Sequence, residues 1–258
     1  MKDVPIPPAF KRRLGKVDPN LANLVRAVGK CEMAFNATHT PFHALARAIT
    51  HQQLNGTAAE SIFGRFVALY PASGVEALLE ADLVLETPDE KLRSAGLSFA
   101  KIASIKDLAR KTLDGVVPPY EILHTLADDE IIERLTQVRG IGRWTVEMLL
   151  MFQLGRPDIL PVDDFGVRNG FRLAYGLRGM PTSRALAEYG ARWAPYRSVV
   201  AWYLWRAVDL HKAGKLPKPV EKTRTKLVKK KAASGRKAAK KKSPMKKRAR
   251  NAKKKQRA

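Results

Sequence analysis

The sequence is short of the residue types on which several classes of protein depend. It holds one cysteine, Cys31, in 258 residues, which excludes both a disulfide framework and a four-cysteine iron–sulfur cluster. It also has no apolar run of membrane-spanning length and no signal-peptide pattern at its N-terminus. We therefore expect an intracellular, soluble protein. Hydrophobic residues make up 45% of the chain, which is enough for a substantial core.

Alternation of apolar and polar residues, the mark of a half-buried strand, is missing as well, and no internal repeat is present. Segments with helical spacing follow one another instead, and several begin with a capping residue such as Asp18, Thr40 or Ser98. The prediction is an all-α protein with two helical lobes and a cleft between them. The expected helices cover residues 21–29, 42–54 (ended by Gly56), 57–70, 75–81, 89–94, 98–114, 129–137, 143–153, 164–175, 183–193 and 196–212.

Acidic residues are nearly absent from the end of the chain. Residues 215–258 hold 21 of the 48 Lys and Arg but one of the 24 Asp and Glu, so they carry +20 of the net charge of +24. They have no aromatic residue and no patterned apolar face, so they cannot build a core. We expect a helical domain over residues 1–214 and a disordered tail over 215–258. Such a tail suits phosphate neutralisation on DNA; a localisation signal and simple solubility are the alternatives.

Two glycines, Gly140 and Gly142, separate two of the expected helices. They allow a sharp turn with positive φ, and Ile141 between them can act as a small hydrophobic plug. The amides of Gly142, Arg143 and Trp144 would then lie at a helix N-terminus, where free N–H groups and the helix dipole suit a phosphate. The pattern indicates a DNA-binding hairpin, although an ordinary tight turn between helices has the same glycine spacing.

The hairpin opens a longer block, residues 135–168, that also contains a Gly/Pro-rich connection and the sequence Val162-Asp163-Asp164-Phe165. This block resembles the helix–hairpin–helix superfamily of base-excision DNA glycosylases, and within it the 3-methyladenine DNA glycosylase II type. The resemblance extends, less densely, from about residue 41 to 210. It implies an enzyme that flips an alkylated purine out of double-stranded DNA, hydrolyses the N-glycosidic bond and leaves an abasic site. We expect it to act as a monomer.

A carboxylate is the group that this reaction needs most. Breaking an N-glycosidic bond develops positive charge on the sugar, and a buried carboxylate beside C1′ stabilises that charge. By resemblance the catalytic residue is Asp164, and Asp163 caps the helix or supports the loop. Spacing alone allows either aspartate to be the catalytic residue.

Tryptophans define the expected base pocket. In bifunctional relatives a lysine stands two residues after the second hairpin glycine and forms a Schiff base. Here Trp144 stands there and residues 135–168 contain no lysine, so the resemblance implies an enzyme without lyase activity. Trp144 and Trp205 are the expected pocket walls, Phe165 a pocket edge, and Trp202 a core residue. Electron-rich rings attract cationic methylated purines; the alternative is that all these aromatics are core.

The expected DNA contacts are of two kinds. By resemblance, the segment 51–55 holds the residue that fills the gap left by the flipped base; Gln53 is the first choice and Leu54 the second. The alternative is that these polar residues lie at the end of a helix without contacting DNA. The hairpin residues expected to contact DNA are Gly140, Gly142, Arg143 and Thr145.

We expect no cofactor and no metal site built from side chains. The resemblance leaves room for one monovalent cation held by hairpin backbone carbonyls, near Thr136, Val138 and Ile141.

Two other functions stay open at this level. A non-catalytic helix–hairpin–helix protein that packages DNA explains the basic tail but gives no reason for Asp164 and the two tryptophans. A related glycosylase for another damaged base is the second alternative. Each reading places the protein with DNA, in the bacterial cytoplasm or nucleoid or in a eukaryotic nucleus.

Overall fold

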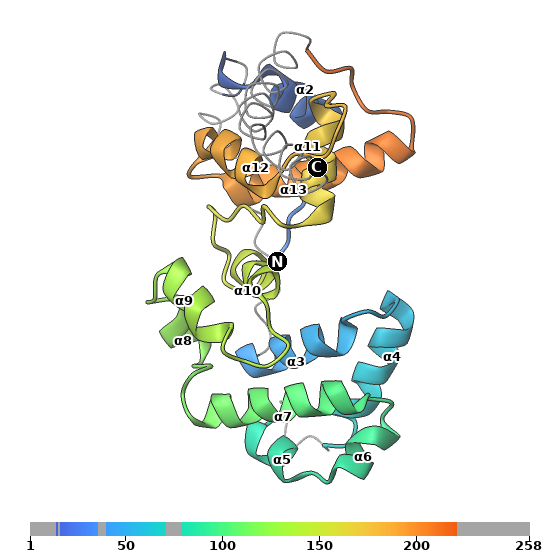
Figure 1. Cartoon of the computed structure of the whole chain (residues 1–258), viewed down its shortest axis with the longest axis vertical. Coiled ribbons are helices and arrows are strands. Elements are labelled where there is room, and N and C mark those ends of the chain that lie inside the picture. The colour runs from blue at the N-terminus through green and yellow to red at the C-terminus, as the bar shows by residue number, and fades with distance from the viewer. Residues whose placement is uncertain (1–13, 15, 36–39, 71–78, 221–258) are drawn as a thin grey trace, which may run out of the picture.

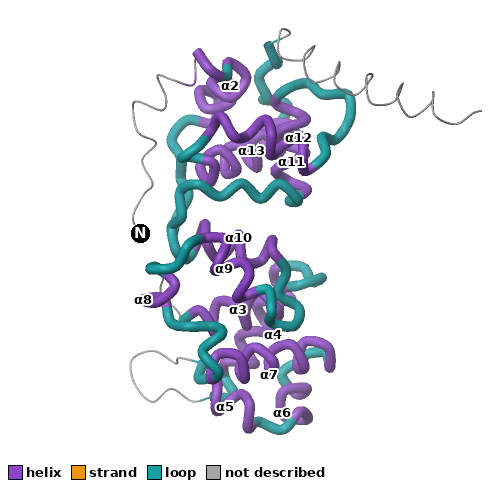
Figure 2. The backbone as a smooth tube through the Cα atoms, turned by 60° about the vertical axis from the view of Figure 1, so that its left-hand side comes forward, coloured by secondary structure: helices purple, strands orange, loops and turns teal. Residues whose placement is uncertain are grey.

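The computed structural model of the chain describes residues 14, 16–35, 40–70 and 79–220. These residues form helices joined by turns and loops, with no strand among them (Figure 2), so the all-α prediction is confirmed. The helices fall into two groups (Figure 1). The group built from the two ends of the described chain, the terminal lobe, contains α2 (Pro19–Val28), α11 (Phe165–Ala174), α12 (Ser183–Gly190), η1 (Ala191–Trp193) and α13 (Arg197–Lys212).

The middle of the chain forms the second group, the central lobe. Its long helix α7 packs against α3, α5 and α6, while α10 packs against α3 and α9. Figures 1 and 2 place α10 at the end of this lobe that faces the terminal lobe. The helices of the central lobe are α3 (Pro41–His51), α4 (Gly56–Val67), α5 (Ala81–Glu86), α6 (Asp89–Ser94), α7 (Phe99–Leu113), α8 (Tyr120–Leu123), α9 (Asp128–Leu135) and α10 (Arg143–Phe152).

The expected caps set the starts of three helices. The Asp18 carboxylate accepts the Leu21 N–H at 3.2 Å, and the hydroxyls of Thr40 and Ser98 accept amides three residues on, at 3.2 and 3.3 Å. Each cap satisfies an amide that has no partner within the first helical turn.

Several helices differ from the prediction. Gly56 begins α4 instead of ending the preceding helix, because the chain already turns at residues 52–55 and Asn55 caps α4. The helix expected at 75–81 lies mostly outside the described residues; residues 79 and 80 are not helical, and α5 starts at Ala81. The short helices α5 and α8, neither of which has a side-chain cap, were not predicted.

Two close contacts hold the terminal lobe together. On α11, a Cβ added to Gly170 would lie 1.8 Å from the Leu204 carbonyl oxygen, so only glycine lets α13 approach this closely. In addition, the buried Asp18 carboxylate accepts the Tyr175 hydroxyl at 2.6 Å and the Trp193 indole N–H at 2.9 Å. Asp18 thereby ties the start of α2 to segments more than 150 residues later.

The helical body reaches past the expected boundary at residue 214. Residues 215–220 are described, and the Val220 N–H donates to the Asn20 side chain of α2 at 2.6 Å. The remainder of the expected tail, residues 221–258, lies outside the described residues. None of the helices in the described part of the chain is long and apolar enough to cross a membrane.

Candidate active site

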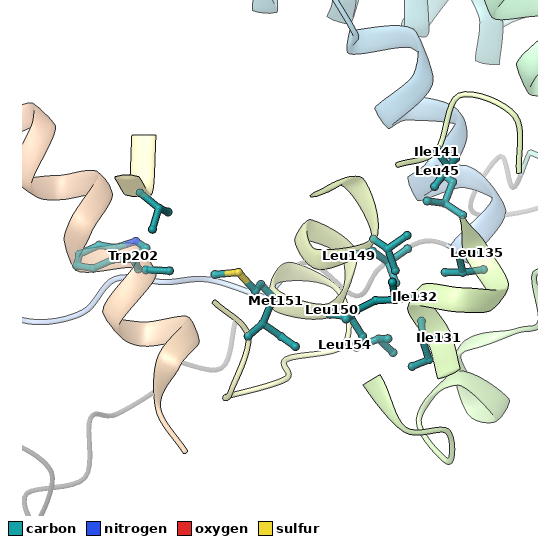
Figure 3. Packing of buried hydrophobic residues seen from close by; sticks show 14 of the residues in the cluster. Leu45, Ile131, Ile132, Leu135, Ile141, Leu149, Leu150, Met151, Leu154 and Trp202 are labelled. Carbon is teal, nitrogen blue, oxygen red and sulfur yellow. The ribbon is translucent and has the colours of Figure 1, made fainter. Parts of the chain in front are cut away.

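The hairpin lies between α9 and α10. Gly140 has a φ of +80°, as expected for a turn glycine, whereas Gly142 has a φ of −96° and caps α10. Only one of the two glycines therefore needs the left-handed region, which corrects the prediction of positive φ around both. Ile141 is buried in the same core cluster as Leu45 of α3 (Figure 3), so its predicted role as a hydrophobic plug is confirmed.

The start of α10 is open to solvent. The first amides bonded to the Gly142 carbonyl are those of Thr145 and Val146; the earlier N–H groups face outward, as at any helix start. A Cβ added to Gly142 would meet nothing within 4 Å, and Arg143 and Trp144 are exposed. This surface can accommodate an anion at the helix N-terminus.

The Thr145 side chain, unlike those of Arg143 and Trp144, is not exposed at the start of α10. It is buried, with 8% of its surface exposed, so its side chain does not project from the hairpin surface toward a DNA backbone. Thr145 instead lines the cavity described below. The carbonyl of Val138, one of those expected around a cation, accepts the Ile141 N–H at 3.0 Å; cation binding itself stays a prediction.

The loop after α3 docks on the hairpin. The Gln52 side-chain amide donates to the Gly140 carbonyl at 2.8 Å, across 88 residues of sequence. The next residue, Gln53, is exposed and has a φ of +59°, and Leu54 is 41% exposed. The loop thus presents Gln53 and Leu54 beside the hairpin, where the hypothesis that one of them fills a gap in the duplex requires them to be.

A cavity of about 620 Å³ lies between α3 and α10. One wall consists of Trp144, Met148 and Phe152 from successive turns of α10, and the opposite wall includes His51 and Gln53 from the end of α3 and the loop after it. A volume of this size is large enough for a base-sized ligand.

The α3 wall carries little net charge. Glu60 of α4 accepts from Arg47 at 2.6 Å and lies 3.1 Å from the Nε2 of His51. Burial and the charge of Arg47 lower the pKa of His51, although Glu60 opposes this shift. This shift favours the neutral imidazole, which does not repel a cationic ligand.

Asp164 joins three elements of the structure. It caps α11 by accepting the Val167 N–H at 2.7 Å. Its Oδ2 accepts the indole N–H of Trp144 from α10, and its Oδ1 accepts the indole N–H of Trp205 from α13, each at 2.8 Å. We call Asp164 and these two tryptophans the indole clamp. It brings together three predicted site residues from both lobes.

Asp163 has a different hydrogen-bond partner from Asp164. Its Oδ1 accepts the Ser183 hydroxyl at 2.5 Å, at the start of α12. The expectation that Asp163 caps the helix is wrong, since Asp164 is the capping residue; Asp163 instead supports the loop, the other part of that expectation. The pair is thus divided between one residue that faces the tryptophans and one that faces α12.

The aromatic residues near the clamp differ in exposure. Trp144 is 48% and Phe165 71% exposed, while Trp202 is 8% exposed and belongs to the core (Figure 3), as predicted. Of the three expected pocket residues, Trp144 lines the cavity, whereas Trp205 and Phe165 are not among its lining residues. Phe152, which was not predicted, stacks on Trp205 with ring centroids 6.0 Å apart. Spacing along α10 offered a signal, because Trp144, Met148 and Phe152 recur every four residues and share one face.

Gly166 is a second residue that sequence reasoning missed. A Cβ at this position would lie 2.7 Å from the Trp205 ring and 3.1 Å from Asp164 Oδ1. Glycine is therefore required for Trp205 to reach the carboxylate, because any side chain here would displace the indole.

Comparison with known proteins gives this geometry a context. Residues 46–195 match the model of the HhH-GPD superfamily base excision DNA repair proteins. The chain belongs to this superfamily. It is 38% identical over 198 residues to DNA-3-methyladenine glycosylase 1 of Schizosaccharomyces pombe, covering 76% of this chain and 86% of that protein. It is also 31% identical to the alkylbase DNA glycosidase-like protein mag2 of the same yeast, over 79% and 95% of the two chains.

Solved structures of HhH-GPD proteins agree with this assignment. The Schizosaccharomyces pombe 3-methyladenine DNA glycosylase in complex with abasic DNA superposes with a TM-score of 0.67 at 36% identity, over 81% of this chain and all of that chain. A DNA-3-methyladenine glycosidase from Bacillus halodurans gives a TM-score of 0.70 at 32% identity, over 83% and 95%. An 8-oxoguanine glycosylase/lyase from Clostridium acetobutylicum is 17% identical and shares the fold alone.

Proposed function

We propose that this HhH-GPD protein is a monofunctional DNA glycosylase that removes cationic alkylated purines, such as 3-methyladenine, from double-stranded DNA. It hydrolyses the N-glycosidic bond and leaves an abasic site. The observation that carries the proposal is the indole clamp, in which Asp164 lies at the junction of the two lobes beside exposed aromatic residues.

Asp164 supplies the charge that the reaction needs. As the base departs, the deoxyribose acquires oxocarbenium character, and a fixed carboxylate near C1′ stabilises this positive charge and orients the attacking water. Three N–H donors fix the carboxylate before substrate arrives, so little reorganisation is needed during the reaction. A cationic purine is already a good leaving group, so the site requires no separate acid to protonate it.

The aromatic residues favour a cationic base. Trp144 and Phe152 line the cavity, and Trp205 stacks on Phe152. Ring faces attract a positive charge by cation–π interaction, which contributes more when the site is desolvated. Two relatives, from Schizosaccharomyces pombe and Bacillus halodurans, are named for 3-methyladenine, which supports the same substrate class here and the broad 3-methyladenine DNA glycosylase II type.

DNA binding follows from the hairpin and the loop beside it. The open N-terminus of α10 suits a phosphate, and Gln53 and Leu54 project from the adjacent loop. A relative has been solved in complex with abasic DNA, which supports duplex DNA as the partner of this chain. We further propose that it acts as a monomer and that residues 221–258 add sequence-independent affinity for DNA.

Release of the free base tests the proposal directly. DNA treated with a methylating agent is incubated with the protein, and free 3-methyladenine is quantified by chromatography and mass spectrometry. We expect release from methylated DNA and none from unmodified DNA. A duplex with 8-oxoguanine serves as a matched control; release of that base alone would replace the proposed substrate class with another.

The absence of lyase activity has its own test. Trp144 stands where lyases of the superfamily carry lysine, so borohydride should trap no covalent adduct and the DNA strand should stay intact until alkali is added. Lys101 is the first residue to examine if an adduct forms, because burial lowers the pKa of its amine. A trapped adduct on any lysine would overturn the monofunctional proposal.

A further inference from the structure

Arg143, the first residue of α10, is hydrogen-bonded to the buried acid Glu147. Its Nε donates to Glu147 Oε1 at 3.0 Å, one helical turn further along. Glu147 is 4% exposed, whereas more than half of the Arg143 side chain is exposed. One terminal nitrogen lies 3.9 Å from Asp129 of α9, which is almost fully exposed. The inner edge of the guanidinium is thus fixed, while its outer edge lies at the open surface beside Gly142.

The fold gains nothing from the charge of Glu147. Burial raises the pKa of this carboxyl, and the charges of Asp163 and Asp164 add to the rise; Arg143 opposes them but does not reverse the shift. A carboxyl with a raised pKa binds protons more tightly in the folded state. Its ionisation therefore lowers stability as pH rises from the unfolded-state pKa through the folded-state pKa. A neutral side chain of similar length without an acceptor, such as methionine, should therefore cost the fold little.

We propose that Glu147 is a positioning residue that holds the guanidinium of Arg143 ready to bind a DNA phosphate at the N-terminus of α10. The inference rests on the proposed function, since it requires that the hairpin bind DNA. The planar guanidinium binds phosphate through parallel N–H donors. Fixing its inner edge reduces the side-chain entropy that phosphate binding would otherwise remove.

The variant Glu147→Met separates positioning from simple electrostatics by the sign of its effect, because methionine is of similar length but has no oxygen to accept the Arg143 Nε–H. Removing a negative charge near a polyanion should tighten DNA binding if only Coulomb forces act. Loss of the Arg143 orientation should instead weaken binding, by about three- to tenfold. The measurement is the dissociation constant of the full chain for a duplex with a stable abasic-site analogue, at fixed salt.

A double-mutant cycle with Arg143→Gln completes the test. If Glu147 acts through Arg143, Glu147→Met should no longer weaken DNA binding once Arg143 is already Gln, and thermal unfolding should show no loss of stability in Glu147→Met. Asp129→Asn is the matched control: it removes an exposed partner of the same arginine and should change affinity by less than about twofold.

Three results would overturn the inference. Tighter binding by Glu147→Met would mean that only the charge of Glu147 acts on DNA binding. Weakening that persists in the Arg143→Gln background would assign Glu147 to the fold rather than to Arg143. A wild-type protein that binds no duplex would overturn the proposed function as well, so the two failures are distinguishable.

Discussion

The two lobes hold their site residues in opposite ways. The terminal lobe supplies Asp164 and Trp205 from helices joined by a buried network at Asp18 and by the close contact at Gly170. The central lobe supplies the hairpin and the neighbouring loop, whose functional candidates other than Thr145 are exposed. The group proposed for chemistry is therefore held rigidly, and the groups proposed for DNA binding face solvent.

Trp144 is where the two lobes meet. It is the second residue of α10 in the central lobe, lines the cavity there, and donates its indole N–H to Asp164 of the terminal lobe. The terminal lobe is thus rigid where a charge must be fixed near C1′. The central lobe is exposed where the protein must contact a large ligand. Substitutions should be able to disrupt the contribution of either lobe to the site separately.

Asp18→Ala should have the largest effect on stability, and it breaks the rigid half. It leaves the Tyr175 hydroxyl and the Trp193 indole N–H without their buried acceptor, a loss of about 2–6 kcal/mol. For a domain of this size the melting temperature should fall by roughly 5–20 °C, as measured by calorimetry. Asp18→Asn keeps an acceptor oxygen and should lose less; equal melting temperatures for Asp18→Ala and wild type would contradict this account of the terminal lobe.

Two glycine substitutions sharpen the comparison. Gly166→Ala pushes Trp205 away from Asp164, so single-turnover base release should slow by about 10- to 100-fold with little change in DNA affinity. Gly142→Ala places a methyl group in open space at the hairpin, so it should weaken DNA binding and leave the rate at saturating enzyme nearly unchanged. The same effect for both variants would mean that the two halves of the site are not separable.

The smallest effect on chemistry should follow from removing residues 221–258. Truncation after Val220 keeps the hydrogen bond to Asn20 and removes most of the basic residues of the chain's end. The slope of log K against log salt should flatten by about 0.9 for each phosphate that these residues neutralise in the full-length protein, while single-turnover base release stays close to wild type. Identical salt slopes for the two proteins would favour localisation as the role of these residues.

Local patterns predicted most of the helices. Where a capping residue preceded an apolar stripe, as at Ser98, the helix began where expected. The prediction missed α5 and α8, six and four residues long and without a side-chain cap, although it found α6, which is equally short and also has no cap. The turn after α3 was placed at Gly56, since sequence alone does not show that Gln53 adopts a positive φ.

The site was only partly accessible from sequence. Resemblance placed Asp164 and the two tryptophans in one site, yet no pattern indicated that both indoles donate to the same carboxylate, because they come from helices 61 residues apart. The bond from Gln52 to Gly140 is likewise a product of tertiary packing. The division between Asp163 and Asp164 follows from their different directions at the start of α11, which single-residue spacing does not resolve.

The single-turnover rate of 3-methyladenine release by Asp164→Asn tests the central claim most directly. The amide keeps the size of the side chain and removes its charge, so the rate at saturating enzyme should fall by about 10²–10³, while binding to abasic DNA stays near wild type. Asp163→Asn, which alters the hydrogen bond with Ser183, should keep most of the activity. Near-normal release by Asp164→Asn, with loss in Asp163→Asn, would contradict the assignment of the catalytic carboxylate.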